Sequence, residues 1–321
     1  MKVPVSIARL LVGITFVFSG YVKLVDPIGS AIKMEEYLSE DVLNMPYLIP
    51  YSLGLALVLI MAELLTGVSL LVGFKPKWTT RIAGVLMAVF LFLTWYSAYY
   101  DKVTDCGCFG DAVKLTPWGT FYKNIVLGIL VLVLVRGWRY IKPLWSKQWA
   151  TWLTFLALVG GLYLSYYVLE HLPIHDFRPY AVGKSIPEGM KEVEGMDIPP
   201  VHDFILETPG GEDLTDSVLE SDKVLLIISY NLALADARSF EMLKNLGDEA
   251  VQHGYEVHFL TASYVDDFQE LKQQYGWSFD MLYADETTLK TMIRANPGIM
   301  MLHKGTVTGK WNWKDIRNIA W

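Results

Sequence analysis

The chain has 321 residues, of which 53% are hydrophobic and only 19% are charged. Soluble domains carry about 25% charged residues, so this composition, with a mean hydropathy of +0.31, excludes a disordered chain and argues against a single soluble globule. The net charge of −7 excludes a generally basic nucleic-acid-binding protein. Two cysteines are too few for a disulfide-rich secreted scaffold.

Nearly all long apolar runs lie in the first 170 residues. A bilayer core about 30 Å thick needs roughly 20 mainly apolar residues as a helix. Five runs meet this requirement and predict membrane-spanning helices at residues 5–22, 51–74, 82–100, 118–135 and 149–169. From residue 171 onward the charges are mixed, which is typical of a water-soluble protein. We therefore predict a membrane half followed by a soluble half.

Basic residues in the connections predict the orientation, because Lys and Arg favour the cytoplasmic side of a membrane. They occur at the first run and in the connections after the second and fourth runs, at Lys2, Arg9, Lys75, Lys77, Arg81, Arg136, Arg139, Lys142 and Lys147. The other two connections are acidic or mixed. This alternation predicts a multi-pass protein of the bacterial inner membrane, with a cytoplasmic N-terminus and a periplasmic C-terminal domain.

Glu63 lies in the middle of an apolar run, and an ionisable side chain at that depth predicts a functional site. It belongs to a proton relay or ligand contact, or it is a hydrogen-bond staple between helices, with Gly67 permitting close approach. The candidate partners are Ser19, Lys23, Thr94 and Tyr96. We group Glu63, Ser19 and Lys23 as an intramembrane polar site, although Lys23 can also snorkel to the outer surface.

The two cysteines, Cys106 and Cys108, flank Gly107 in the connection between the third and fourth runs. The predicted topology places them in an oxidising compartment. A bridge between cysteines this close strains the backbone, and a strained disulfide is more oxidising. The pair is therefore a catalytic thiol–disulfide pair, or an inert pair that pins the loop. A third interpretation is a metal site with His171 and His175, which follow the fifth run on the same side.

Three features resemble the DoxX/MauE group of small membrane proteins. They are the Ser-Gly-x-x-Lys-Leu-x-Asp-Pro segment at 19–27, the Glu63 run with Gly67 and Gly73, and the Cys-Gly-Cys-Phe-Gly loop at 106–110, which resembles MauE in particular. The resemblance covers about residues 1–140. It implies a four-helix membrane protein linked to redox or disulfide chemistry in the cell envelope. The fifth apolar run and the soluble half depart from that pattern.

The soluble half begins with residues 171–200, where five prolines predict a linker or an extended lead-in. Hydrophobic periodicity then predicts alternating elements. Strands are expected at 201–207, 223–230 and 255–260, helices at 236–253, 265–275 and 315–319, and a hairpin of strands at 298–302 and 307–311.

This order of elements resembles the thioredoxin fold, in its TlpA and peroxiredoxin-like branch. Asn296-Pro297 looks like the family's cis-proline, where a strand edge meets an extended polypeptide. The family's Cys-x-x-Cys would fall at Leu234 and Ala237, and no cysteine follows Cys108. Because disulfide exchange needs a thiolate, the resemblance implies a redox-inactive domain that binds polypeptide. The side chains of Trp311 and Trp313 are interface anchors, or they pack on the domain itself.

We therefore expect a multi-domain chain, with an all-α transmembrane bundle of five helices followed by an α/β thioredoxin-like periplasmic domain. The predicted parts are a DoxX/MauE-like four-helix membrane domain at 1–145, a fifth transmembrane helix at 146–170, a linker at 171–200 and the thioredoxin-like domain at 201–321.

The favoured function is a non-enzymatic accessory, assembly or chaperone-like subunit without a cofactor. Its partners would be the lipid bilayer and either another envelope membrane protein or exported polypeptides. The alternative is a thiol–disulfide or electron-relay oxidoreductase that uses Cys106 and Cys108, and it would need an outside acceptor such as a quinone. A small-molecule carrier using Glu63 is disfavoured, because the five helices show no evident inverted repeat.

Overall fold

The computed structural model describes residues 2–100, 110–113, 115–193 and 198–321. The chain divides into two compact units, Met1–Leu169 and Glu170–Trp321, and each is described by itself. Cys106 and Cys108, the predicted thiol pair, lie outside the described residues.

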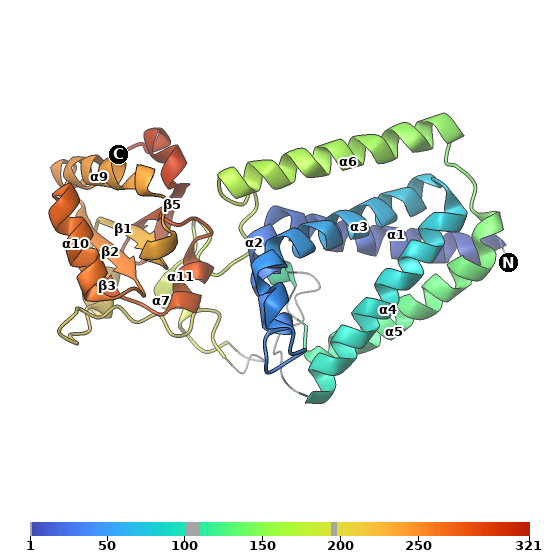
Figure 1. Ribbon diagram of the computed structural model, residues 1–321, viewed down its shortest axis with the longest axis horizontal. Coiled ribbons are helices and arrows are strands. Elements are labelled where there is room, and N and C mark those ends of the chain that lie inside the picture. The colour runs from blue at the N-terminus through green and yellow to red at the C-terminus, as the bar shows by residue number, and fades with distance from the viewer. Residues whose placement is uncertain (1, 101–109, 114, 194–197) are drawn as a thin grey trace. The chain divides into compact units, whose positions relative to one another are not determined.

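The N-terminal unit is all-α (Figure 1). In the described part of the chain, five helices are long and apolar enough to cross a membrane, which confirms the prediction. They are α1 (Lys2–Val25), α3 (Ser52–Val72), α4 (Pro76–Tyr100), α5 (Pro117–Gly137) and α6 (Lys147–Glu170). Shorter helical segments are α2 (Pro27–Leu38), η1 (Pro46–Tyr51), η2 (Gly110–Ala112) and η3 (Trp138–Tyr140).

The sequence at the helix ends explains why α1 does not continue into α2. Asp26 separates the two helices, and its carboxylate accepts the backbone N–H of Gly29 at 2.9 Å as an N-cap of α2. Pro27 occupies the first turn of α2, where the lack of an N–H group is tolerated. The helix α2 can therefore take a new direction beside α3.

The helices α1 and α3 pack with their backbones in close contact. A Cβ atom on Gly20 would lie 2.9 Å from the Cα atom of Leu64, and one on Gly67 would lie 2.7 Å from the backbone nitrogen of Val17. Since the later residue of α1 faces the earlier residue of α3, the two helices run antiparallel. Glycine at these positions permits the approach, as is usual for helices in membranes.

The C-terminal unit is built on a five-stranded sheet in the order β3-β2-β1-β4-β5. The strands β1 and β2 are parallel, as are β2 and β3, whereas β4 is antiparallel to both β1 and β5. The strands are β1 (Val224–Ser229), β2 (Glu256–Thr261), β3 (Asp280–Tyr283), β4 (Gly298–His303) and β5 (Thr306–Asn312). The helical segments are α7 (Ile186–Gly189), α8 (Thr215–Glu220), η4 (Leu232–Leu234), η5 (Ala237–Ser239), α9 (Phe240–Gln252), α10 (Val265–Tyr275), α11 (Glu286–Met292) and η6 (Trp313–Asn318).

Both faces of this sheet are covered (Figure 1). On one face, Leu225 and Ile227 of β1 pack with Leu243 of α9. On the other face, Leu226 and Ile228 pack in a second cluster with the side chains of α11. All six residues of β1 are buried, as expected for a central strand covered on both sides. The architecture confirms the predicted thioredoxin-like α/β domain.

Several elements of the C-terminal unit differ from the prediction. Residues 201–207 do not form a strand, because Asp203 has a φ of +57° that breaks the extended run, and only Glu207 makes isolated bridges. The side chains of Phe204 and Leu206 are nevertheless buried in the core. The strand β3 and the helices α7, α8 and α11 are absent from the sequence-based prediction.

The first part of the predicted linker is an ordered segment, which we call the strap (residues 171–186). Its backbone pairs with β5, since Gly183 N–H donates to the Val307 carbonyl at 2.8 Å and Val307 N–H donates to the Lys184 carbonyl at 2.9 Å. Ile186 N–H donates to the carbonyl of Gly305 at 2.8 Å. The strap therefore covers the start of the outer edge of β5, at residues 305–307.

A buried charged cluster fixes the strap to the same strand. The Asp176 carboxylate accepts hydrogen bonds from Arg178 Nε at 2.7 Å and Lys310 Nζ at 2.6 Å. Burial would raise the pKa of Asp176, but the charges of Arg178 and Lys310 outweigh burial and lower this pKa to about 2. Burial, with the charge of Arg178, lowers the pKa of Lys310 to about 7 against the attraction of Asp176. The Asp176 carboxylate thus forms ion pairs with both Arg178 and Lys310.

This cluster predicts a stability that rises with pH above neutrality. Lys310 has a pKa of about 7 in the folded protein, whereas an unfolded lysine has a pKa of about 10.4. Between these values the unfolded chain binds more protons, so the free energy of unfolding increases with pH by up to about 1.4 kcal/mol per unit. Below pH 7 the contribution is constant, because both states are protonated.

The measurement is pulse proteolysis of the C-terminal unit in the full chain, in urea and mild detergent, between pH 7 and 9.5. Lys310→Met removes the titrating group and leaves Asp176 paired with Arg178. The variant should lose most of the rise with pH. An equal rise in the variant would show that another group causes it.

Candidate functional site

The membrane unit holds a buried ion pair between α1 and α3. Lys23 Nζ lies 2.6 Å from Glu63 Oε2, and the two side chains are 10% and 3% exposed. The ammonium also lies 5.0 Å from the centroid of the Phe90 ring. The structure therefore does not bear out snorkelling of Lys23 to the surface. Glu63 lies inside α3, and its carboxylate gives the ammonium a buried partner instead.

The third predicted member of this polar site, Ser19, lies with Lys23 and Glu63 on the wall of one small cavity. Asn124 of α5 lines the same cavity and donates from Nδ2 to Thr94 Oγ1 at 3.3 Å. Sequence reasoning missed Asn124, although it is the one amide in the fourth apolar run. Tyr96, another candidate partner of Glu63, instead donates to the carbonyl of Val42 at 2.7 Å.

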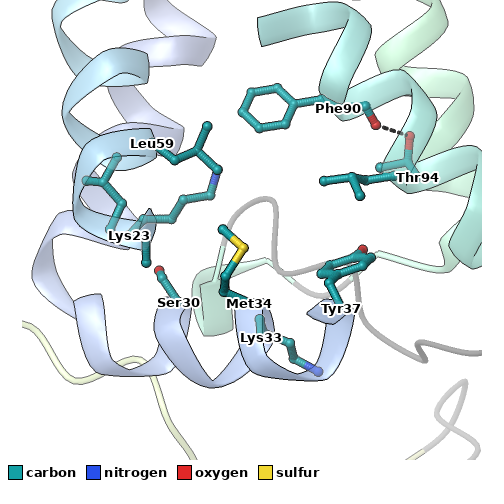
Figure 2. A pocket seen from close by; sticks show the side chains of 11 residues that line it. Lys23, Ser30, Lys33, Met34, Tyr37, Leu59, Phe90 and Thr94 are labelled. Carbon is teal, nitrogen blue, oxygen red and sulfur yellow. Dashed lines mark hydrogen bonds between the residues drawn. The ribbon is translucent and has the colours of Figure 1, made fainter. Parts of the chain in front are cut away.

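A second cavity lies beside Lys23 (Figure 2). Residues of α1, α2, α3 and α4 form its wall, and its volume is about 70 Å³. Figure 2 shows Lys23, Met34 and Thr94 around this space. Phe90 lines both cavities, as does Lys23. The Lys23 side of the ion pair thus lines a space that can hold a small bound group.

In the C-terminal unit, Asn296 and Pro297 precede β4 and are joined by a cis peptide bond. The Asn296 side chain connects two segments, since Oδ1 accepts from Ser229 Oγ and Nδ2 donates to the Asn231 carbonyl, both at 2.8 Å. Asn296 therefore fixes the end of β1 and the start of the next loop beside Pro297.

That loop carries the two positions where the thioredoxin resemblance would place cysteines. Leu234 ends η4 and is 73% exposed, and Ala237 begins η5 and is also exposed. Ser263 Oγ accepts the backbone N–H of Leu232 at 2.9 Å, so the loop is also tied to the end of β2. The next residue, Tyr264, is 80% exposed. An exposed aliphatic and an exposed aromatic side chain thus share this end of the sheet.

An open groove adjoins Arg238, the residue after Ala237. Its wall contains Arg238, Met242, Trp313 and Arg317, and its volume is about 510 Å³. Hydrogen bonds from Arg238 lower the pKa of Asp236 to about 2, so this carboxyl is ionised at neutral pH. The indole of Trp313 is largely buried and lies under the Arg238 guanidinium, 5.6 Å from it. Trp311 is partly buried against the same core cluster.

The two histidines proposed as metal ligands have other contacts. His171 Nδ1 lies 2.8 Å from Asp315 Oδ2, and the ring of His175 lies 6.3 Å from that of Phe177. In the described ranges no group of three or more His, Cys, Asp or Glu residues is arranged to hold a metal ion.

The membrane unit can be compared with known families. Residues 1–137 match the family model of methylamine utilisation protein MauE. The MauE resemblance predicted from the Ser19–Pro27, Glu63 and cysteine motifs is therefore confirmed over 137 of the 321 residues. The match does not extend to the DoxX part of that prediction. No curated protein sequence matches this chain.

Two solved structures are similar to the chain at low identity. One is a hypothetical protein from Sinorhizobium meliloti 1021, with 18% identity, a TM-score of 0.25 and coverage of 33% of this chain. This chain spans 64% of that protein's length. The other is a thioredoxin-like protein from Bacteroides caccae ATCC 43185, with 13% identity, a TM-score of 0.28 and coverage of 83% of this chain and 79% of that one.

Proposed function

We propose that this protein, with its MauE-like unit in the membrane, is an accessory subunit that holds a partner polypeptide without exchanging a disulfide with it. The partner would be an exported polypeptide or another membrane protein of the cell envelope. One observation carries the proposal: the Asn296 amide holds the Leu234 loop beside Pro297, at the position where thioredoxin-like enzymes have thiols. Here that position presents Leu234 and Ala237.

The chemistry of this surface suits an extended polypeptide. Covering an exposed leucine removes apolar surface from water and contributes about 1.5–3 kcal/mol when burial is complete. The adjoining groove offers an aromatic ring and guanidinium groups, which are frequent anchors in protein interfaces. No cysteine occurs after Cys108, so the C-terminal domain has no thiolate of its own.

We further propose that the C-terminal domain is periplasmic and the N-terminus cytoplasmic. The support is the alternation of charge, because the connections after α3 and α5 carry the basic residues. A periplasmic domain would meet exported polypeptides and envelope complexes, whereas a cytoplasmic one would not.

The test is site-specific photo-crosslinking of the full chain in intact cells. A photoreactive residue replaces Leu234, and a matched one replaces Val251, which is 57% exposed near the opposite end of α9. Position 234 should give an adduct of one defined mass, and position 251 should not. Adducts of equal yield at both positions, or at neither, would contradict the proposal.

The same experiment separates this function from the thiol–disulfide alternative. Replacing both cysteines, by Cys106→Ser with Cys108→Ser, should leave the adduct at position 234 unchanged. Loss of the adduct, together with a mixed disulfide trapped by an alkylating reagent in the parent protein, would instead favour an electron relay through these cysteines.

A further inference from the structure

The cavity beside Lys23 has a largely apolar wall that also contains two lysines, Lys23 and Lys33. Its apolar residues come from α2, α3 and α4 and are Met34, Ala56, Leu59, Ile60, Phe90 and Leu93. The cavity volume is about 70 Å³. This is several times the roughly 10–15 Å³ that one water molecule needs. Such a wall favours an apolar body over a hydrated ion.

Three hydroxyl groups on the wall already have partners within the protein. Thr94 Oγ1 donates to the Phe90 carbonyl at 2.7 Å, and Ser30 Oγ donates to the Asp26 carbonyl at 3.3 Å. Tyr37 shares a hydrogen bond of 2.9 Å with Ser97. A lysine ammonium has three N–H donors, of which Glu63 accepts one. The Lys33 side chain points away from the cavity and pairs with Glu36 (Figure 2). Lys23 is therefore the group best placed to donate to a ligand.

The charge of the ligand follows from the ion pair. Lys23 and Glu63 sum to zero net charge, and they lie in helices that are long and apolar enough to cross a membrane. An anionic ligand would leave one uncompensated negative charge at this depth, which is expensive in a low-dielectric region. A neutral acceptor such as a carbonyl oxygen accepts a hydrogen bond from the ammonium and keeps the site neutral.

We propose that this cavity binds a neutral, lipid-soluble molecule that places a carbonyl oxygen on the ammonium group of Lys23. The apolar part of the molecule lies against Met34, Leu59 and Phe90. Glu63 acts as a positioning residue, because it holds the ammonium at the cavity wall and balances its charge. The membrane supplies the ligand, and the site is independent of the polypeptide-binding surface of the C-terminal domain.

The test measures binding of three probes to the purified full chain in an alkyl glycoside detergent, which contains no carbonyl group. The probes are 2-dodecanone, dodecanoate and dodecane, which have similar chains and differ in the head group. The ketone should bind at least about 10-fold more tightly than the other two, since a hydrogen bond to a charged group is worth about 1.5–3 kcal/mol. Methyl undecanoate, compared with the ketone, distinguishes a lipid ester from a free ketone as the carbonyl source.

Matched variants locate the bound head group. Lys23→Met with Glu63→Gln removes both charges together and should weaken ketone binding by about 10-fold or more. Lys33→Met is the control, because Lys33 borders the same cavity but points away from it toward solvent and pairs with Glu36 (Figure 2). This control should bind the ketone as the parent protein does.

A second pair of variants keeps the ion pair and changes only the space. Ala56→Leu adds a side chain into the cavity wall and should lower ketone binding, whereas Ala157→Leu makes the same change on α6, away from the cavity. The proposal is overturned if the ketone binds no better than dodecane, if dodecanoate binds best, or if the charge-free double variant binds the ketone normally.

Discussion

Replacing Lys23 with methionine alone is expected to lower the free energy of unfolding of the membrane unit by about 3–5 kcal/mol. The ammonium lies 2.6 Å from Glu63 Oε2, and the Glu63 side chain is only 3% exposed. Its removal leaves a carboxylate in the middle of a helix bundle without its compensating charge. The effect should be measured as a shift in unfolding of the full chain in mixed micelles.

Two controls separate loss of charge compensation from loss of a side chain. The double variant, Lys23→Met with Glu63→Gln, carries no isolated charge and should recover most of the stability lost by Lys23→Met, since buried pairs are often replaceable together. Lys33→Met removes a half-buried lysine paired with Glu36 and should change stability by less than about 1 kcal/mol. A double variant as unstable as the single one would refute this account of the pair.

Replacing Gly67 with alanine should separate α1 from α3 and destabilise the membrane unit by about 1–3 kcal/mol. The added Cβ atom would lie 2.7 Å from the backbone nitrogen of Val17 and 2.9 Å from the Cβ atom of Phe16. A backbone atom cannot turn away as the end of a flexible side chain can, so the helices must move apart. Because the same contact sets the spacing of Lys23 and Glu63, ketone binding should weaken too.

Gly54→Ala is the matched control on the same helix. A Cβ atom there meets no atom within 4 Å, and alanine is the better helix former by about 1 kcal/mol in water. The control should be neutral or slightly stabilising in the same unfolding measurement. If Gly67→Ala behaves as Gly54→Ala does, the close backbone contact does not hold the two helices together.

Much of the fold could be predicted, because its signals are local in the sequence. A run of about 20 apolar residues specifies a membrane helix by itself, and the buried strand β1 follows directly from a continuous apolar stretch. The strand β3 has only four residues and joins the sheet through its pairing with β2. The formation of such a short strand depends on pairing with its neighbour rather than on its own composition, so its sequence does not predict it.

The failure at residues 201–207 has a different cause. The alternation of apolar and polar residues is real, and it does bury Phe204 and Leu206. The backbone at Asp203 turns into the left-handed region, and Leu206 N–H donates to Thr215 Oγ1 at 2.9 Å instead of to a strand. Hydrophobic periodicity predicts which side chains are buried. It does not predict which groups form hydrogen bonds with the backbone N–H and C=O groups.

Part of the candidate site could also be predicted from the sequence. Glu63 stands out as a charge in an apolar run, and Lys23 was among its four candidate partners. The choice between those partners required the antiparallel register of α1 and α3, which the contacts of Gly20 and Gly67 fix in three dimensions. Asn124 contributes from α5, and nothing in the sequence relates its position to that of Lys23.

The strap has a consequence for a protein whose copies share one membrane. Diffusion in two dimensions brings identical domains together often, and an open strand edge is a template for joining sheets from different copies. Hydrogen bonds from Gly183 and to Lys184 occupy that edge of β5 near Val307. The strap thereby leaves fewer free backbone groups at the start of β5 for pairing with a second copy.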